Sequence, residues 1–167
     1  PNEGSYTFMG QSVFDLKEKK RNELYKSNIG FIFQAYHLID ELTVYENIET
    51  PLLYQDVKKS DRKAMVADML DRFNMVGKKD LFPNQLSGGQ QQLVGIARAL
   101  IAKPKLLLAD EPTGNLDQTT AARVFDLMLE LNQKMNTALV IVTHDQQLAQ
   151  RMDRVLVLGE GSLSAFI

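Results

Sequence analysis

A chain of 167 residues with 44% hydrophobic residues is long enough for one compact unit with a real core, and its composition indicates neither disorder nor a repeat array. The net charge of −2, with basic and acidic residues interspersed, gives no reason to expect a nucleic-acid partner, and the lack of cysteine excludes disulfides, thiol catalysis and cysteine-based metal sites. No apolar run approaches the ~20 residues that a membrane-spanning helix needs, so any membrane role is expected to come through a partner.

From the N-terminus onward, the chain shows a basic run and then several apolar runs. Lys17–Arg21 is typical of a solvated helix face, with a phosphate-binding patch as the alternative. Four apolar runs are typical of strands buried on both faces of a parallel sheet: Ile29–Phe33, Lys105–Asp110, Ala138–Thr143 and Arg154–Leu158. Between the second and third runs, apolar residues recur at helical spacing: Val124, Leu127, Met128, Leu131 and Met135. Strand, helix and strand in this order predict a βαβ unit and an α/β fold.

The segment from Ala35 to Gln85 has a helical pattern instead. Thr43 and Glu46 have the spacing of a capping box, and a later stretch carries an apolar stripe at Val66, Met69, Leu70 and Phe73. We therefore expect a helical lobe inserted into the sheet, with its methionines in the lobe core rather than in a cofactor pocket. At the C-terminus, Gly159–Ser162 indicates a turn into a last short strand, Leu163–Ile167, which is expected to complete a hairpin.

A serine and two glycines stand directly before a helical pattern at Ser87, Gly88, Gly89 and Gln90. The serine and the glutamine fit a capping box, so a helix is expected to start here. A helix N-terminus presents unpaired N–H groups, and glycines let an anion approach the backbone. The segment therefore predicts half of a phosphate site, and an ordinary glycine-rich helix start is the alternative.

Polar side chains follow three of the predicted strands, on the sheet edge where open parallel sheets place ligands: Gln34, Asp110 with Glu111, and His144. Asp110 suits Mg²⁺ held among nucleotide phosphates, and Glu111 suits the orientation or deprotonation of a water. The alternatives are a surface carboxylate pair that caps a turn and a structural histidine. Together with the glycine-rich anion cap, these residues predict a nucleoside-triphosphate hydrolase site.

The same residues resemble the motifs of the ATP-binding subunit of ATP-binding-cassette (ABC) transporters, in order and over nearly the whole length. Leu86–Gln90 resembles the signature motif, and Leu106–Glu111 resembles Walker B. Phe31–Gln34 is similar to the Q-loop, Gly114–Asp117 to the D-loop and Val142–Asp145 to the switch-histidine segment. The resemblance is strongest to the lipoprotein-release, macrolide-export and FtsE-like branch. It implies a P-loop NTPase (RecA-like) parallel sheet core, with an inserted helical subdomain and a C-terminal β-hairpin.

The resemblance also implies a division of the chain and a set of ligands. Residues 1–34 would be the N-terminal remainder of the ATPase core, 35–95 the helical signature subdomain and 96–167 the rest of the core. ATP and Mg²⁺ are the implied ligands, and a head-to-tail homodimer with ATP at its interface is the implied assembly. Nucleic acid is not an expected partner.

Within that dimer, the resemblance implies a role for each motif residue. Asp110 and Gln34 would hold Mg²⁺, Glu111 would polarise the water, and His144 would contact the γ-phosphate. Gln34 would also link the site to movement of the lobe. Nucleotide contacts would come from Asp117 and, in the opposite subunit, from Ser87, Gly88, Gly89 and Gln90.

The branch further implies an FtsX-like integral membrane permease, which would hold the subunit on the cytoplasmic face of the membrane. In the family, the region after the Q-loop forms the groove that receives a permease helix. Candidate contacts here are Tyr36, His37, Leu38, Leu42 and Tyr45, and packing within the lobe is the alternative for each.

Two features depart from the family pattern. Leu93 stands where this branch usually has arginine, which removes one polar contact. The 167 residues contain no G-x-x-x-x-G-K-[ST], and Pro1–Gly4 resembles the family just after the helix that follows its P-loop. We therefore expect the first strands, an adenine-stacking aromatic residue and the P-loop to lie upstream.

Two other functions stay open. One is a non-catalytic fragment that folds or pairs without turnover. The other is an ABC ATPase of the DNA-repair or chromosome-maintenance type, which is disfavoured because those proteins generally carry a long coiled coil between the segments that correspond to Gln34 and Leu86. In this chain a short helical lobe is expected there instead.

Overall fold

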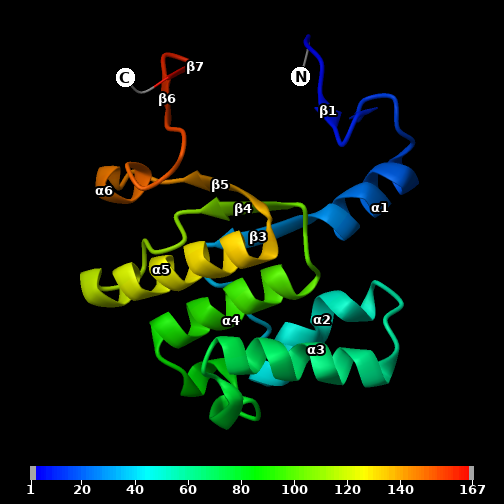
Figure 1. Cartoon of the computed structure of the whole chain (residues 1–167), viewed down its shortest axis with the longest axis vertical. Coiled ribbons are helices and arrows are strands. Elements are labelled where there is room, and N and C mark those ends of the chain that lie inside the picture. The colour runs from blue at the N-terminus through cyan, green and yellow to red at the C-terminus, as the bar shows by residue number, and fades with distance from the viewer. Residues whose placement is uncertain (1–2, 166–167) are drawn as a thin grey trace.

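The computed structural model describes residues 3–165, and its centre is a parallel sheet of three strands. The strands β3 (Ile29–Phe33), β4 (Leu106–Asp110) and β5 (Ala138–Val142) lie in the order β3-β4-β5 (Figure 1). Phe33 pairs with Asp110, and Asp110 with Val142, so the three strands end at the same level. The predicted βαβ unit is confirmed, because β4 and β5 are parallel and a long helix connects them.

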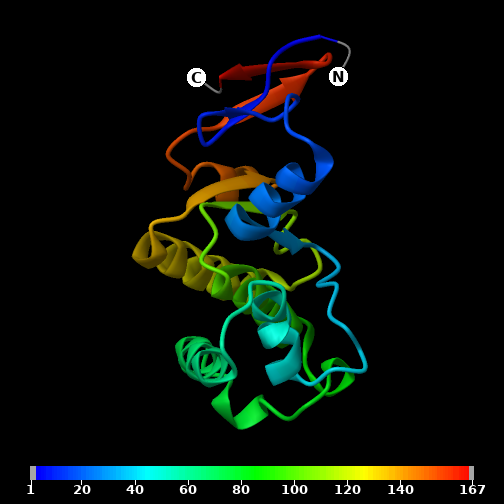
Figure 2. The ribbon, with the colours of Figure 1, turned by 90° about the vertical axis from the view of Figure 1, so that its right-hand side faces the viewer.

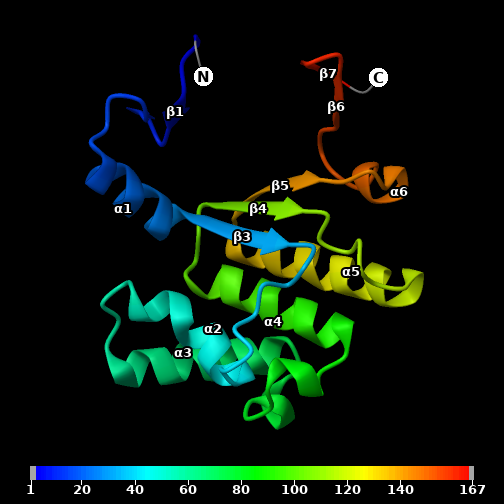
Figure 3. The ribbon, with the colours of Figure 1, turned by 180° about the vertical axis from the view of Figure 1, so that it is seen from behind.

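Two helices cover one face of this sheet (Figures 1 and 3). They are α4 (Gly88–Ile101) and α5 (Gln118–Met135). The predicted stripe of α5 is confirmed: Val124, Met128 and Leu131 are buried, and Leu127 and Met135 pack against the same core. The core runs without interruption from the buried strand residues through α4 and α5 into the lobe.

The predicted helical lobe is present. It consists of α2 (Val44–Leu53), α3 (Lys59–Arg72) and the 3₁₀ turns η1 (Val76–Lys78) and η2 (Pro83–Gln85). The predicted capping box at the start of α2 forms, and Val66, Met69, Leu70 and Phe73 are buried as expected. Helix α2 packs along α4. Because α4 is one helix from residue 88 to 101, it crosses the proposed boundary at residue 95, and that division stays a prediction.

The remaining elements lie around the sheet. Helix α1 (Glu18–Asn28) leads into β3, and its basic start is almost entirely exposed, which confirms the solvated helix face. The short helix α6 (Gln146–Ala149) follows β5. Two hairpins, β1 (Thr7–Phe8) with β2 (Gln11–Ser12) and β6 (Leu156–Gly159) with β7 (Ser162–Ala165), lie at the end of the molecule opposite the lobe (Figure 2). Among the described residues, no helix is both long and apolar enough to span a bilayer.

The fourth apolar run does not join the parallel sheet, so that prediction is wrong. Within residues 3–165, strand β6 pairs only with β7, in the antiparallel hairpin that the turn residues predicted, and each residue of β6 is exposed. The loop residues Glu160 and Gly161 both have positive φ, 47° and 77°, which is the geometry of a tight two-residue hairpin. The local turn therefore determines the partner strand. Phe166 and Ile167, assigned above to the last strand, lie outside the described residues.

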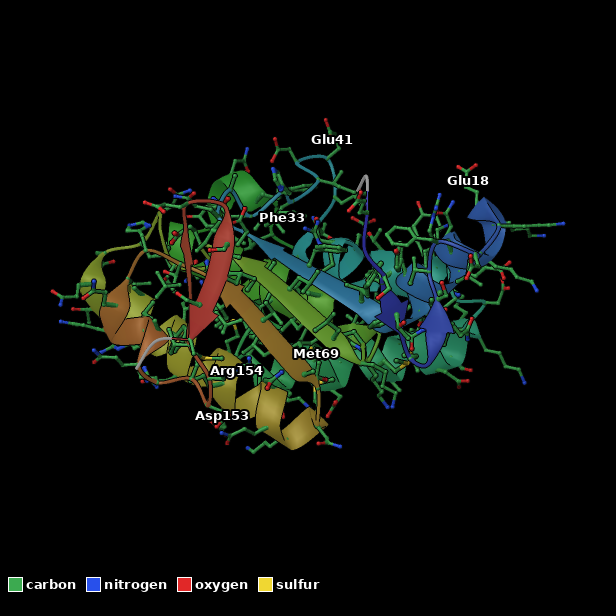
Figure 4. All side chains as sticks on the ribbon, turned by 90° about the horizontal axis from the view of Figure 1, so that it is seen from above. Glu18, Phe33, Glu41, Met69, Asp153 and Arg154 are labelled. Carbon is green, nitrogen blue, oxygen red and sulfur yellow. The ribbon has the colours of Figure 1, made fainter. Side chains whose placement is uncertain are left out.

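Burial of the strands on both faces is also a wrong prediction. Alternate side chains of β3 and β5 are open, with Phe31 49%, Val140 51% and Val142 61% exposed. The cause is one-sided packing, since α4 and α5 both lie on the other face. Figure 4 looks onto the open face, where Phe33 marks the carboxyl end of β3.

A buried asparagine holds the loop that enters the lobe. The Asn47 side chain is completely buried on α2, and its Oδ1 accepts a hydrogen bond from the N–H of Ile39 at 2.9 Å. Its Nδ2 lies at 3.0–3.1 Å from the carbonyl oxygens of Ile39, Leu42 and Thr43. One amide therefore satisfies several backbone groups of a loop that has no regular structure.

We predict that Asn47→Ala lowers the free energy of unfolding by about 3 kcal/mol, because it leaves the N–H of Ile39 and the carbonyl of Leu42 without partners. Urea denaturation of the full-length protein measures the change. Asn22→Ala, at an exposed position of α1, is the control and should stay within about 0.5 kcal/mol of the wild type. Equal stability of the two variants would contradict the role given to Asn47.

Candidate functional site

The strand register brings the predicted site residues to one edge of the sheet. Gln34, Glu111 and Thr143 are each the first residue after a paired strand, so they follow the aligned positions Phe33, Asp110 and Val142. The carboxyl ends of β3, β4 and β5 point the same way in Figure 3. Asp110 is exposed at the end of β4, as the sequence predicts for a ligand-facing carboxylate.

Glu111 is held in an unusual backbone conformation. Its φ is 44°, in the left-handed region that a non-glycine residue enters only when its surroundings hold it there. Its N–H donates to the carbonyl of Val142 at 2.9 Å, and its own carbonyl accepts from the N–H of Gly114 at 3.0 Å. The N–H and the carbonyl of Glu111 are therefore both held by hydrogen bonds, and the backbone conformation sets the direction of the side chain.

The carboxylate of Glu111 binds the end of the neighbouring strand. Oε1 accepts a hydrogen bond from the His144 N–H at 2.8 Å and lies 2.6 Å from His144 Nδ1, while Oε2 accepts from the Thr143 hydroxyl at 3.1 Å. An ionised carboxylate only accepts, so this contact is a hydrogen bond in the tautomer that carries its proton on Nδ1. The Glu111 side chain is 20% exposed, whereas that of His144 is 84% exposed, so the histidine is free to reach a ligand.

Gln34 forms a reciprocal amide pair with Asn115. Gln34 Nε2 donates to Asn115 Oδ1 at 3.1 Å, and Asn115 Nδ2 donates to the Gln34 carbonyl at 2.9 Å. A Cβ on Gly114 would lie 2.7 Å from Gln34 Nε2, so a larger residue there would require the Gln34 side chain to move. The loop after β3 is thus joined to the Gly114–Asp117 segment. The roles of Asn115 and Thr143 were not predicted from the sequence, although both residues lie within the segments that resemble the D-loop and the switch histidine.

The predicted helix start at Ser87 is confirmed. The Ser87 hydroxyl accepts from the Gln90 N–H at 3.4 Å, and Gln90 Oε1 accepts from the Ser87 N–H at 3.1 Å, which completes the capping box. The N–H groups of Gly88 and Gly89 belong to the first helical turn and have no partner within the helix. This end of α4 is therefore a helix N-terminus with donors left for an anion.

The structure adds a second reason for the two glycines. A Cβ on Gly88 would lie 2.8 Å from the Tyr36 hydroxyl, and a Cβ on Gly89 would collide with the methyl group of Thr120. The start of α4 is therefore packed closely against the loop after β3 and the first turn of α5. Among residues 3–165, no hydrogen bond joins Ser87–Gln90 to Asp110, Glu111 or His144.

Asp117 caps α5. Its side chain accepts from the Thr120 N–H at 3.1 Å, and hydrogen bonds from Thr120 lower the pKa of this exposed carboxyl below its usual value. The charge then lies at the positive end of the helix dipole. The nucleotide contact assigned to Asp117 stays a prediction beside this structural role.

The loop after Gln34 is more enclosed than the sequence suggested. His37 is exposed, but the other candidate permease contacts are half-buried, and two of them pack against the core: Leu38 and Tyr45. Tyr36 and His37 have positive φ, and the Arg98 guanidinium holds the turn by donating to their carbonyl oxygens at 3.1 and 2.7 Å. Burial lowers the pKa of Arg98. Sequence analysis did not single out this arginine.

Leu93 is half-buried and packs against the hydrophobic core. An apolar side chain suits that position in this chain, where the branch it resembles usually has arginine.

This fold, with polar residues at the strand ends and an inserted helical lobe, is that of an ATP-binding cassette. The sequence model of the ABC transporter family matches residues 1–114. The chain is 52% identical to "Lipoprotein-releasing system ATP-binding protein LolD" of Legionella pneumophila (strain Lens), over 99% of its length and 73% of the relative. It is 47% identical to the LolD protein of Hydrogenovibrio crunogenus, over 96% of its length and 70% of the relative.

Comparison with solved structures gives the same family. The dimeric ATP-binding cassette MJ0796, described in a post-hydrolysis state with ADP and Pi, superposes with a TM-score of 0.84 and 35% identity, over 98% of this chain and 72% of that one. The chain therefore belongs to the ABC transporter family.

The packing of Gly89 against Thr120 can be tested with a single variant and a compensating double variant. We predict that Gly89→Ala destabilises the protein by about 1–3 kcal/mol through overpacking. Adding Thr120→Ser removes the offending methyl, and the nearest remaining atom, Thr120 Cβ, is 3.9 Å from the new Cβ position, so stability should return. Urea denaturation of both variants measures this, and failure of the second change to restore stability would contradict the contact.

Proposed function

We propose that this chain forms part of an ATP-hydrolysing subunit of an ABC transporter that acts in lipoprotein release, the function in the names of the LolD relatives. The observation that carries this proposal is the carboxylate of Glu111, held at the carboxyl edge of a parallel sheet in contact with His144. An oriented carboxylate beside an exposed histidine, on the edge where such sheets bind ligands, suits the attack of water on a terminal phosphate.

Glu111 is the proposed catalytic carboxylate. The bonds from His144 and Thr143 fix both of its oxygens, and the turn at Glu111 fixes the backbone beneath them. A carboxylate restrained in this way orients a water and accepts its proton as the water attacks the γ-phosphate of the substrate. The exposed ring of His144 then contacts the γ-phosphate, and its bond to Glu111 keeps the two groups in one arrangement.

Asp110 and Gln34 are the proposed Mg²⁺ ligands. Both are exposed beside Glu111, and a carboxylate with an amide oxygen is the hard oxygen donor set that Mg²⁺ prefers. Gln34 donates its Nε2 to Asn115, which directs the amide oxygen away from that bond. The donors present therefore fit the ion, and the ion would neutralise charge on the nucleotide phosphates.

The N-terminus of α4 is proposed to act on the nucleotide of a second subunit. Ser87, Gly88, Gly89 and Gln90 form a capped helix start with no hydrogen bond to the catalytic carboxylate of the same chain within residues 3–165. The solved cassette to which this chain is similar is described as a dimer. A head-to-tail dimer would place the cap of one chain over the phosphates held by the other, and Asp117 would add a nucleotide contact.

An FtsX-like integral membrane permease is the proposed partner, and it would hold the subunit on the cytoplasmic face of the membrane. The loop after Gln34 is the proposed contact, because it is bonded both to the site through Gln34 and to the lobe through Asn47. Within this loop, exposed His37 and half-buried Tyr36 and Leu38 are the candidate contacts.

We predict that Glu111→Gln in the full-length subunit keeps nucleotide binding and lowers ATP turnover by about 10²-fold or more, because the amide cannot accept the proton. Phosphate release at saturating ATP measures turnover, and a fluorescent nucleotide measures binding. Glu130→Gln, an exposed change on α5, is the control and should keep full turnover. Near-normal turnover in Glu111→Gln with binding intact would reject Glu111 as the catalytic carboxylate.

A polypeptide of these 167 residues alone is expected to bind Mg-ATP weakly and to show no hydrolysis above background. The reason is electrostatic: a P-loop supplies backbone N–H donors and a lysine to the phosphates, and without them Asp110 and Glu111 face a polyanion with little positive charge to offset them. Calorimetric titration of this polypeptide and of one that includes a P-loop compares the two. Micromolar affinity with steady turnover in the shorter polypeptide would contradict the expectation.

A further inference from the structure

Gln92 is a buried polar residue that none of the motif assignments uses. It lies on α4, one position before Leu93, and is 1% exposed. Its Nε2 donates to the carbonyl oxygen of Pro112 at 2.5 Å, whereas its Oε1 has no hydrogen-bond partner among the described residues. The unpartnered Oε1 costs stability, whereas an apolar side chain at this position would leave the Pro112 carbonyl without this donor. The hydrogen bond to Pro112 is therefore what a glutamine provides here.

The hydrogen-bond acceptor, the Pro112 carbonyl, indicates the role of Gln92. Pro112 directly follows Glu111, so its carbonyl belongs to the turn whose left-handed first residue aims the catalytic carboxylate. Other bonds hold that turn from the sheet and from within, through Val142 and Gly114. Gln92 adds a hydrogen bond from helix α4 to the Pro112 carbonyl, which accepts no backbone hydrogen bond among the described residues.

We propose that Gln92 is a positioning residue that ties helix α4 to the turn carrying Glu111. This inference rests on the proposed function, and it adds a coupling within one chain. Helix α4 begins with the cap that, in the proposed dimer, contacts the nucleotide of the other subunit, and Gln92 lies about one helical turn beyond it. A shift of the cap is therefore transmitted to the catalytic carboxylate of the same chain through one hydrogen bond.

Two variants of the full-length subunit test the bond. Gln92→Met keeps the approximate volume and removes the donor, and it should lower kcat at least ~10-fold with KM for ATP changed less than ~2-fold, the pattern of a residue that acts on the reacting arrangement. Gln92→Glu places a carboxyl against the Pro112 oxygen. Burial raises the pKa of a carboxyl, and only its protonated form can donate to that oxygen.

The pH profile separates positioning from packing. The kcat of Gln92→Glu is divided by that of the wild type at each pH, so that the pH dependence of the wild type cancels. This ratio should rise as the pH is lowered from about 8 to about 6. The same ratio for Gln92→Met should stay flat. A flat ratio in both variants, or wild-type kcat in Gln92→Met, would overturn the proposal.

Asn132→Leu is the matched control. Asn132 is also buried, and its Nδ2 donates to the Thr137 carbonyl at 2.8 Å near the other end of α5 from Asp117. The Asn132→Leu change removes a comparable buried hydrogen bond of a side-chain amide, but at a position away from the site. The stability of the protein should therefore fall while kcat is kept. If Asn132→Leu lowers kcat as much as Gln92→Met does, the effect of Gln92 is general destabilisation, and the proposal fails.

Hydrogen exchange supplies a readout that needs no turnover. The N–H of Glu111 donates to Val142, and that of His144 donates to the Glu111 carboxylate. Both should exchange faster in Gln92→Met and at the wild-type rate in Asn132→Leu, and unchanged exchange in Gln92→Met would overturn the proposal. If instead Glu111→Gln keeps wild-type turnover, the proposed function fails, and the exchange rates still decide whether Gln92 holds the turn.

Discussion

The parallel register of β3, β4 and β5 is the constraint on which the site depends. Because Phe33, Asp110 and Val142 are aligned, the residues that follow them leave the sheet side by side. The N–H of Glu111 then reaches the Val142 carbonyl, and its side chain reaches Thr143 and His144 at the end of the next strand. A shift of β5 by one residue would exchange its two faces and separate this carboxylate from its partners.

The strained turn at Glu111 shows how the core supports the site. A left-handed non-glycine residue persists only where the surroundings hold it, and here the support comes from the sheet, from Gly114 and from the buried helix α4. Pro112 and Thr113, the next two residues, are buried. The Glu111 carboxylate is therefore partly exposed, while the backbone that directs it lies against the interior.

Local signals in the sequence predicted the features that depend on neighbouring residues. The capping boxes at Thr43 and Ser87 and the apolar stripe of α5 each involve residues within a few turns of one helix. Contacts between distant segments were missed: Gln34 and Asn115 are 81 positions apart, and Gln92 and Pro112 are 20. Strand β6 was assigned to the wrong sheet, since a short apolar run does not specify its partner.

Helix α4 connects the loop after Gln34, the turn after Glu111 and the start of α5, because it contacts each of them. Its first glycines pack against Tyr36 and Thr120, Gln92 binds the turn after Glu111, and Arg98 holds the turn after Gln34. Because α4 is one uninterrupted helix from residue 88 to 101, we expect a displacement at one contact to move the other contacts as well. In the proposed dimer, the cap over one nucleotide and the carboxylate at the other would then adjust together, and the loop proposed to contact the permease would move with them.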